Sequence, residues 1–253
     1  MAARGHRLPG ATRDDGSVRV RRVLTTRAGG RSRSPYDSFN LGDHVGDQPA
    51  AVAANRDRLA RGIGLDPSRV AWMNQVHGTD VAVVEGPQSE VPTADALVTD
   101  RPRQALAVVV ADCVPVLLAD PEAGVVAAAH AGRTGAAAGV LPRTLDVMAE
   151  LGAERDRVEV LLGPGVCGLC YEVPEAMRDE VDAVLPGSAG TTRVCTPSLD
   201  LHAGLRRQLD ELGIRKIDAD TRCTLEDDQL FSHRRARPTG RFAGVTWWEY
   251  DTR

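Results

Sequence analysis

The chain has 253 residues, 42% of them hydrophobic, which suits one large domain or two small ones with a substantial core. A formal net charge of −4 argues against non-specific binding to nucleic acid, and five cysteines, a sparse and odd set for this length, favour a reducing compartment over a disulfide framework. Because no apolar run approaches the ~20 residues of a membrane span, and none follows the N-terminal arginines as in a signal peptide, we expect a cytoplasmic protein without nucleic-acid or membrane partners.

The first part of the chain predicts a tail, a strand and a helix. Residues 1–16 show no hydrophobic periodicity and predict a flexible N-terminal tail. Val18–Leu24 alternates apolar and basic residues, as a half-buried strand does. Glycine-, serine- and proline-rich loops follow, and Ala50–Arg61 then places its apolar residues on one face of a helix.

The centre of the chain predicts mainly strands. Arg69–His77 and Asp80–Val84 flank a Gly-Thr pair, an arrangement that is typical of a hairpin. Ala96–Thr99 and Ala105–Val110 are short and apolar throughout, which indicates strands that are covered on both faces.

A second predicted hairpin brings two reactive side chains together. Its strands, Val116–Ala119 and Val125–Ala129, flank a strong turn sequence of Asp, Pro, Glu, Ala and Gly. If the last residue of the first strand faces the first residue of the second, Cys113 falls opposite the neighbour of His130, within about 4.5–7 Å. We therefore expect Cys113 and His130 to meet at the open end of this hairpin. His77, beside the turn of the first hairpin, could reach the same point.

The remaining elements complete the fold class. After His130 comes AGRTGAAAG and then a helical pattern to about Leu151, and Pro142 within it indicates either a kink or the start of a second helix. Further strands are predicted at Arg157–Leu162, Ile214–Ile217 and Phe242–Trp247, and further helices at Pro174–Leu185 and Asp200–Leu212. Interleaved helices and strands, together with hairpins, favour a single α/β or α+β domain over residues 17–253 with a mixed β-sheet flanked by helices.

His77, Cys113 and His130 are candidate metal ligands. Imidazole nitrogen and thiolate sulfur bind zinc well, and three protein ligands leave one tetrahedral position open, as in catalytic zinc sites. Each residue also has a simpler interpretation, because a histidine can be a hydrogen-bonded surface residue and Cys113 an inert core thiol. Asp95 and Asp112 could support the ligands or only shape turns.

Positive charge and small residues surround these candidates. The sequence AGRTG begins where a strand passes into a helix, and free backbone N–H groups at a helix start attract anions. Thr134 could cap this helix, and Arg133 adds positive charge. A metal beside an anion pocket suggests a phosphate or hydroxide nucleophile. Other arginines could supply further charge: Arg27, Arg234, Arg235 and Arg241.

The pair Cys167-x-x-Cys170 has two chemical interpretations and one inert one. It could be half of a zinc knuckle or a redox pair. A knuckle would need a second CxxC, whereas Cys195 and Cys223 are isolated in the sequence. A structural or inert role is therefore favoured. His233 is a weaker candidate for a pocket residue.

Nine ordered sequence blocks resemble one known family. They are TTRAGG, SFNLGDHVGD, QVHG, ADALVTD, ADCVPVLLAD, AAAHAG, GPG…CYEV, LDL and RRARPTGRFAGVTW. From about Val18 to Trp248 the chain looks like the YfiH/YlmD-type "multicopper polyphenol oxidoreductase laccase" domain, whose members are described as purine nucleoside phosphorylases. The resemblance implies a single mixed α/β domain similar to the catalytic domains of cytotoxic necrotizing factors.

The resemblance also implies a site and an activity. It implies zinc bound by His77, Cys113 and His130, which would be the catalytic residues, with copper as the less favoured metal. It implies phosphorolysis of adenosine, inosine and methylthioadenosine to the free base and ribose 1-phosphate or its methylthio analogue, with adenosine deamination as a further activity. The partners would be purine nucleosides and phosphate, and the protein a monomer or homodimer. Candidate substrate- and phosphate-binding residues within or beside the matching blocks are Arg27, Asn40, Gln75, Asp112 and Arg133.

Two blocks depart from the family pattern. The family reads HAGWRG where this chain reads HAGRTG, so Arg133 replaces a tryptophan and Thr134 replaces an arginine. A stacking contact with a base would then be lost, while Arg133 could hold phosphate from one residue earlier. GPGVCGLCYEV replaces GPxIGPCCYEV, so only Cys170 aligns with that element.

Three other functions fit parts of the sequence. Cys113 beside His130 could form a thiolate–imidazole nucleophile for amide hydrolysis, and related family members are linked to editing of peptidoglycan precursors. Copper-dependent phenol oxidation would need many more histidines than the six present. A non-catalytic accessory protein of cell division with a vestigial site is the remaining alternative.

Overall fold

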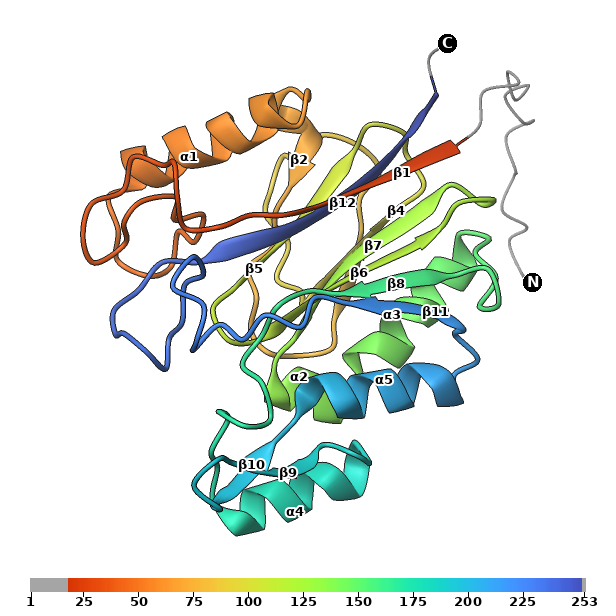
Figure 1. Ribbon diagram of the computed structural model, residues 1–253. Helices are drawn as coiled ribbons and strands as arrows, with labels where there is room; N and C mark the ends of the chain where they lie inside the picture. Colours follow the sequence, from red (N-terminus) through yellow and green to blue (C-terminus); the bar gives the residue numbers. More distant parts are fainter. Residues whose placement is uncertain (1–17, 252–253) are drawn as a thin grey trace.

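Two β-sheets lie face to face between outer helices over residues 18–251, the part of the chain that the computed structural model of the protein describes (Figure 1). The tail predicted for residues 1–16 lies outside the described residues. The four-stranded sheet contains, in spatial order, β1 (Val18–Leu24), β12 (Phe242–Tyr250), β5 (Ala105–Val110) and β2 (Val70–Ala71). The six-stranded sheet contains β11 (Lys216–Ala219), β8 (Glu159–Leu162), β6 (Val114–Asp120), β7 (Val125–Ala131), β4 (Ala96–Thr99) and β3 (Val81–Val83).

Helices cover the two outer faces of this pair of sheets (Figure 1). α1 (Pro49–Gly62) packs on the four-stranded sheet. The short 3-10 helix η1 (Pro67–Arg69) follows it in the chain. The six-stranded sheet is covered by α2 (Arg133–Ala138), α3 (Val140–Glu150) and α5 (Leu201–Glu211). At one end α4 (Glu175–Val184) packs against a small sheet of β9 (Ala189–Thr191) and β10 (Pro197–Leu199). Within the described range, every helix is too short or too polar to cross a bilayer.

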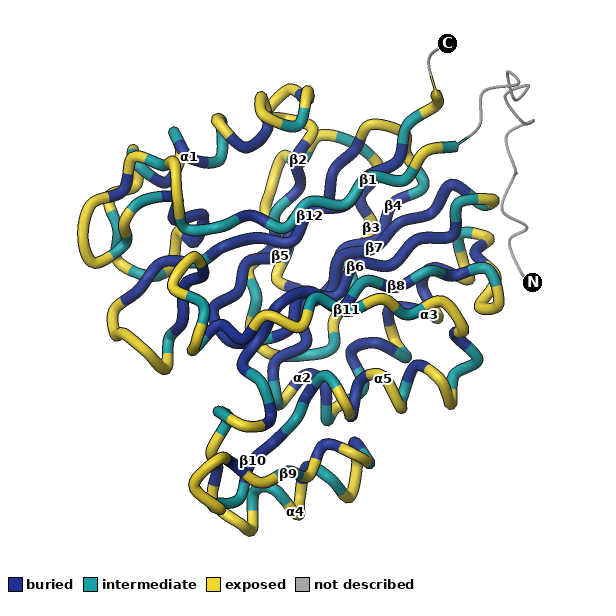
Figure 2. The backbone as a smooth tube through the Cα atoms, in the orientation of Figure 1, coloured by how far each residue is buried: buried dark blue, intermediate teal, exposed yellow. Residues whose placement is uncertain are grey.

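Alternate residues of the central strands face two different hydrophobic cores, one between the sheets and one under the helices. Figure 2 shows these strands as buried. Val116 and Leu118 of β6 pack toward the helices, whereas Leu117 packs between the two sheets. This period of two is the geometry of a strand, and burial on both faces explains why these strands are apolar throughout. Each fully buried valine or leucine contributes about 1.5–3 kcal/mol, so the core fixes the strand ends that carry the site.

The mixed sheets confirm the predicted α+β class, but the first predicted hairpin is wrong. β2 pairs in parallel with β5 in one sheet, and β3 pairs in parallel with β4 in the other. The chain therefore crosses from one sheet to the other between β2 and β3. Residues 76–78 donate backbone hydrogen bonds to the Asp95 side chain and do not form a two-residue hairpin turn.

The second predicted hairpin is confirmed, with its register shifted by one residue. β6 continues to Asp120, which pairs with Val125, because the turn is one residue shorter than predicted. Extending this register places Cys113 across from Gly132. Cys113 still lies at the open end of the hairpin beside His130.

The helical pattern after His130 divides into two helices. Gly139 has a φ of 92° in the left-handed region, where it ends α2 and precedes α3. Pro142 lies in the first turn of α3, where its missing N–H costs no helical hydrogen bond. The cap predicted for Thr134 is wrong, because Gly132 occupies the N-cap position and Thr134 lies inside α2.

Candidate functional site

His77, Cys113 and His130 come from three segments and converge at one end of the six-stranded sheet. Cys113 precedes β6, His130 lies near the end of β7, and His77 lies in the loop between β2 and β3. Their ligand atoms all lie within 4.8 Å of one another. Cys113 Sγ is 3.8 Å from His77 Nε2, and the two imidazole rings meet edge to face with centroids 4.6 Å apart. The three side chains thus form one cluster.

The buried carboxylate of Asp95 positions both histidines. Its Oδ1 accepts hydrogen bonds from the backbone N–H of His77, at 2.9 Å, and from Nδ1 of His130, at 2.8 Å. Its Oδ2 accepts from the backbone N–H groups of Val76, at 3.2 Å, and Gly78, at 2.6 Å. Because Nδ1 of His130 is engaged, Nε2 is the ring nitrogen left for a metal.

Backbone conformation allows the close approach of these residues. His77 has a φ of 61°, in the left-handed region, within the turn whose N–H groups Asp95 accepts. A Cβ at Gly132 would lie 2.8 Å from His77 Cδ2 and 3.0 Å from Cys113 Sγ. Glycine at this position therefore lets the end of β7 lie against His77 and Cys113.

The pKa of Cys113 is lowered and that of His130 is raised, and both shifts favour a thiolate beside an imidazolium. Burial would raise the pKa of the Cys113 thiol, but His130 and His77 outweigh burial and lower this pKa to about 6. Burial would lower the pKa of His130, but Cys113 and Asp95 raise it to about 9. A thiolate is the form of cysteine that binds metals and attacks electrophiles, so both chemistries are open to Cys113 at neutral pH.

The cluster fits a metal ion held by three protein ligands. Two imidazole nitrogens and one thiolate form a donor set that suits zinc. His130 is buried and oriented by Asp95, whereas His77 is exposed. One coordination position would therefore be open on the exposed side, where a substrate could enter.

A cavity of about 260 Å³ adjoins the cluster and is rich in arginine. Among the described residues that line it, Asp112 is the one carboxylate. The cavity therefore carries excess positive charge, which suits phosphate or another anion. Burial and the charges of Arg237 and Arg241 lower the pKa of His233 in the same wall. The arginines that line the cavity are Arg133, Arg234, Arg237 and Arg241.

Three of the five predicted binding residues line this cavity. The side-chain amide of Gln75 exchanges two hydrogen bonds, of 2.8 and 2.9 Å, with the backbone of β5. Asp112 accepts from Thr224 Oγ1 at 2.7 Å and from the backbone N–H of Arg234 at 2.8 Å. Arg133, the first residue of α2, lines the cavity beside the metal-type cluster.

The other two predicted binding residues, Arg27 and Asn40, are not among the described residues that line the cavity. Arg27 donates to the Asp37 carboxylate at 3.3 Å, and its guanidinium lies 5.0 Å from the centroid of the Phe231 ring. Asn40 is buried, and its Oδ1 accepts from the backbone N–H of Arg241 at 2.8 Å. Asn40 thus supports the cavity through Arg241.

His44, Tyr171 and His233 also line the cavity, and of these three only His233 is a pocket candidate from the sequence. The guanidinium of Arg234 lies 4.3 Å from the Tyr171 ring centroid. Nδ1 of His233 is buried and has no hydrogen-bond partner within residues 18–251. The CYEV block contains Tyr171, but no local pattern could have shown that this ring faces the cavity.

Arg235 is not among the described residues that line the cavity, in contrast to Arg234 and Arg237 of the same arginine-rich block. It donates to the backbone carbonyls of Thr224 and Asp227, at 2.7 and 2.9 Å, and also to that of Leu230. The role of Arg235 is thus to hold the 224–230 loop together.

Comparisons with known proteins show the family of this chain. Residues 21–249 match the family described as multi-copper polyphenol oxidoreductase laccase. A purine nucleoside phosphorylase of Mycobacterium tuberculosis is 61% identical over 234 residues, which cover 92% of this chain and 94% of that protein. The crystal structure of YlmD from Geobacillus stearothermophilus has a TM-score of 0.85 at 33% identity and covers 91% of this chain and 92% of its own. For YfiH from Bacillus licheniformis the TM-score is 0.82 at 30% identity, with 90% and 92% covered. The chain therefore belongs to the multi-copper polyphenol oxidoreductase laccase family.

Proposed function

We propose that this protein is a zinc-dependent purine nucleoside phosphorylase that acts on adenosine, inosine and methylthioadenosine. The observation that carries the proposal is that a His-Cys-His cluster and four arginines line the same cavity. Phosphorolysis needs a bound phosphate beside a nucleoside, and guanidinium groups match phosphate geometry. The name of the Mycobacterium tuberculosis relative, purine nucleoside phosphorylase, supports the same reaction.

In this reaction an oxygen of phosphate forms a bond to ribose C1′ while the C1′–N9 bond breaks. The electron pair of the broken bond passes to the purine, which takes up a proton and leaves as the free base. Arg133, Arg237 and Arg241 would hold the phosphate, and charge-assisted bonds of this kind also fix its orientation. His233, which lines the same cavity, could contact the nucleoside.

A zinc ion held by His77, Cys113 and His130 would supply a Lewis acid that positions or polarises one of the two substrates. Asp95 would hold a proton on Nδ1 of His130 through the 2.8 Å bond and so direct Nε2 toward that ion. Two histidines and one cysteine can bind either zinc or copper, and zinc is proposed because it is the metal that the family resemblance implies. Metal analysis of the purified protein separates the two metals.

The experiment is an assay of purine release from inosine and adenosine, with and without phosphate. Phosphate-dependent release of hypoxanthine and adenine together with ribose 1-phosphate is expected. The single variants His77→Ala, Cys113→Ala and His130→Ala should lose both the bound metal and the activity. Full activity of a metal-free Cys113→Ala protein would refute the proposal.

Adenosine deamination is a possible side reaction, and the same assay tests it. Zinc-dependent base deaminases use a carboxylate as a proton shuttle. Asp112 is the carboxylate of the described cavity wall, and both of its oxygens already accept hydrogen bonds. Release of inosine and ammonia from adenosine without phosphate would establish deamination, and its loss in Asp112→Asn would assign the shuttle.

A second candidate function is amide hydrolysis with Cys113 as nucleophile. The observation that favours it is the contact of Cys113 with two imidazoles, with Sγ 3.8 Å from His77 Nε2; this cluster lowers the pKa of Cys113 to about 6 and raises that of His130 to about 9. A thiolate beside an imidazolium is the resting state of many cysteine nucleophiles. A covalent acyl adduct on Cys113, formed in metal-free protein with a peptidoglycan-precursor amide, would support this function.

A further inference from the structure

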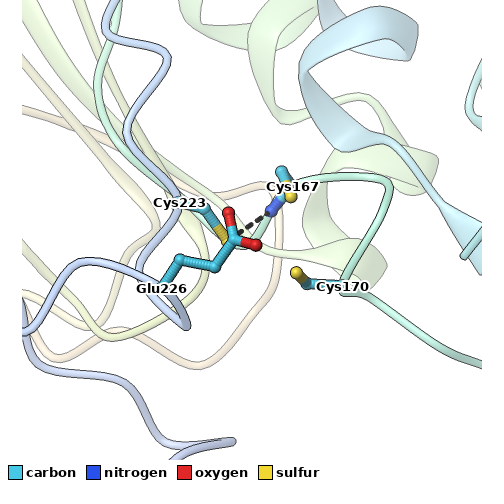
Figure 3. Close-up of side chains that lie close together, drawn as sticks. All are labelled: Cys167, Cys170, Cys223 and Glu226. Atoms are coloured by element: carbon cyan, nitrogen blue, oxygen red, sulfur yellow. Dashed lines mark hydrogen bonds between the residues drawn. The ribbon is translucent and has the colours of Figure 1, made fainter. Parts of the chain in front are cut away.

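A second cluster of potential ligands lies apart from the His-Cys-His cluster and shares no residue with it. The Sγ atoms of Cys167, Cys170 and Cys223 and a carboxylate oxygen of Glu226 all lie within 4.8 Å of one another. Figure 3 shows these side chains converging from two loop segments. Cys223 is buried, the other two cysteines are half-buried and Glu226 is exposed.

Each loop segment forms a tight turn with its two ligands three residues apart. In the first turn the backbone N–H of Cys170 donates to the carbonyl of Cys167 at 2.9 Å. In the second, the backbone N–H of Glu226 donates to the carbonyl of Cys223 at 3.1 Å. The missing partner of the CxxC sequence is therefore a CxxE sequence that lies more than fifty residues later in the chain.

Backbone pairing holds the two turns side by side. Gly165 forms a parallel bridge with Cys223, and the backbone N–H of Thr224 donates to the carbonyl of Gly165 at 3.0 Å. The backbone N–H of Cys167 also donates to Cys223 Sγ at 3.4 Å (Figure 3). This N–H···S arrangement, in which a backbone amide stabilises negative charge on sulfur, is the hydrogen bond that a metal-bound thiolate would accept.

We propose that Cys167, Cys170, Cys223 and Glu226 bind a second metal ion, a structural zinc with four protein ligands. Structural zinc sites have four protein ligands, often in two closely spaced pairs, and both cysteine sulfur and carboxylate oxygen bind zinc. With Zn–S bonds of about 2.3 Å, tetrahedral geometry needs sulfur atoms about 3.8 Å apart. The present separations of up to 4.8 Å would close by at most about 1 Å, which side-chain rotation can supply.

One positively charged side chain, that of Arg193, contacts this cluster. Arg193 already donates to Cys170 Sγ at 3.5 Å and to Glu226. Because the Arg193 side chain is more than half exposed, it can move into solvent when a metal binds.

The metal would fasten two segments that build the wall of the catalytic cavity. Thr224, next to Cys223, donates to the Asp112 carboxylate at 2.7 Å. The backbone N–H of Val166, next to Cys167, donates to the carbonyl of Asp112 at 2.9 Å. Tyr171, next to Cys170, lines the cavity. The proposed ion is therefore a structural support for residues on one side of the cavity.

Metal stoichiometry of reduced, purified protein tests the proposal. We expect about two zinc ions per chain in the unmodified protein, one for each cluster. Cys113→Ala removes a ligand of the first cluster and should leave one ion, whereas Cys113→Ala combined with Cys223→Ser should leave none. Cys195→Ser changes an exposed cysteine outside both clusters and should leave the stoichiometry unchanged. Circular dichroism establishes that each variant is folded.

Cobalt substitution in the Cys113→Ala background then identifies the ligands. We expect an intense sulfur-to-cobalt charge-transfer band and the visible absorption of tetrahedral cobalt, both lost with Cys170→Ser and retained with Cys195→Ser. If folded, reduced Cys113→Ala protein binds neither zinc nor cobalt, the proposal is overturned. It is also overturned if mass spectrometry finds Cys167 joined to Cys170 or Cys223 by a disulfide after purification with zinc under reducing conditions. If only the His-Cys-His cluster fails to bind metal, the unmodified protein should hold one zinc ion, and Cys223→Ser should remove it.

Discussion

Replacement of Asp95 by asparagine should weaken metal binding at the His-Cys-His cluster without touching a ligand. The four hydrogen bonds that Asp95 accepts are divided equally, with two donors at Oδ1 and two at Oδ2. An asparagine keeps one oxygen and replaces the other by an NH2 group, which can only donate. In either orientation, the NH2 group therefore faces two donors.

The size of the effect follows from this arrangement. Loss of two hydrogen bonds to a buried charged group costs roughly 3–6 kcal/mol, at about 1.5–3 kcal/mol each. If the NH2 group faces His130, that ring must present Nδ1 as an acceptor and carry its proton on Nε2, where it blocks the metal. Because partners of metal-bound histidines typically contribute 10–100-fold in affinity, we expect a zinc affinity that is lower by about that factor.

The assay is zinc titration against a competing chelator, combined with denaturant unfolding. Asp120→Asn is the matched control, because Asp120 is also fully buried in the six-stranded sheet and accepts backbone N–H groups and an arginine. We expect Asp120→Asn to lower the free energy of unfolding and leave zinc affinity unchanged. Unchanged zinc affinity in a folded Asp95→Asn protein would show that Asp95 does not position the ligands.

Three further outcomes are expected from the same cluster and cavity. Gly132→Ala should lower zinc affinity while the fold persists, because the new Cβ would lie 2.8 Å from His77 Cδ2 and 3.0 Å from Cys113 Sγ; equal affinity in a zinc titration would contradict the packing argument. In metal-free protein, the rate of Cys113 alkylation should fall as pH drops through about 6, since the reactive thiolate is then protonated. His130→Ala should move that midpoint upward, and an unmoved midpoint would contradict the assigned cause. Arg237→Ala should raise the KM for phosphate by about 10–100-fold, equivalent to one charge-assisted hydrogen bond, with steady-state kinetics as the measurement.

Matched controls accompany these variants. Gly62→Ala places a methyl group where no atom lies within 4 Å, so it should leave zinc affinity unchanged. Arg61→Ala removes an exposed arginine whose partner is Asp57 on the same helix, and the KM for phosphate should not change. An equal rise in KM for Arg61→Ala and Arg237→Ala would indicate a general charge effect and not a phosphate contact.

The sequence by itself determined most elements and brought together two of the three candidate ligands. Local hydrophobic periodicity predicts strands and helices, because each pattern reflects burial that repeats along a few neighbouring residues. The short turn after β6 also linked Cys113 to His130, since residues that face each other across a hairpin are close in space. Even the error of one residue in register left both side chains at the same end of the hairpin.

The placement of His77 depended on the tertiary structure. Its predicted hairpin does not exist, because β2 and β3 pair with strands of different sheets. What brings His77 to the cluster is the Asp95 side chain, which accepts the N–H groups of its turn. Such a contact between a loop and a distant carboxylate leaves no periodic trace in the sequence.

The cavity and the second cluster were likewise decided by contacts between distant segments. The sequence offered Arg234 and Arg235 as equals, but the fold directs the first to the cavity and the second to backbone carbonyls. Cys223 looked isolated until the bridge to Gly165 placed it beside the CxxC pair. Local patterns report which residues are buried and in what order, whereas the meeting of side chains far apart in the chain is fixed only when the sheets pack.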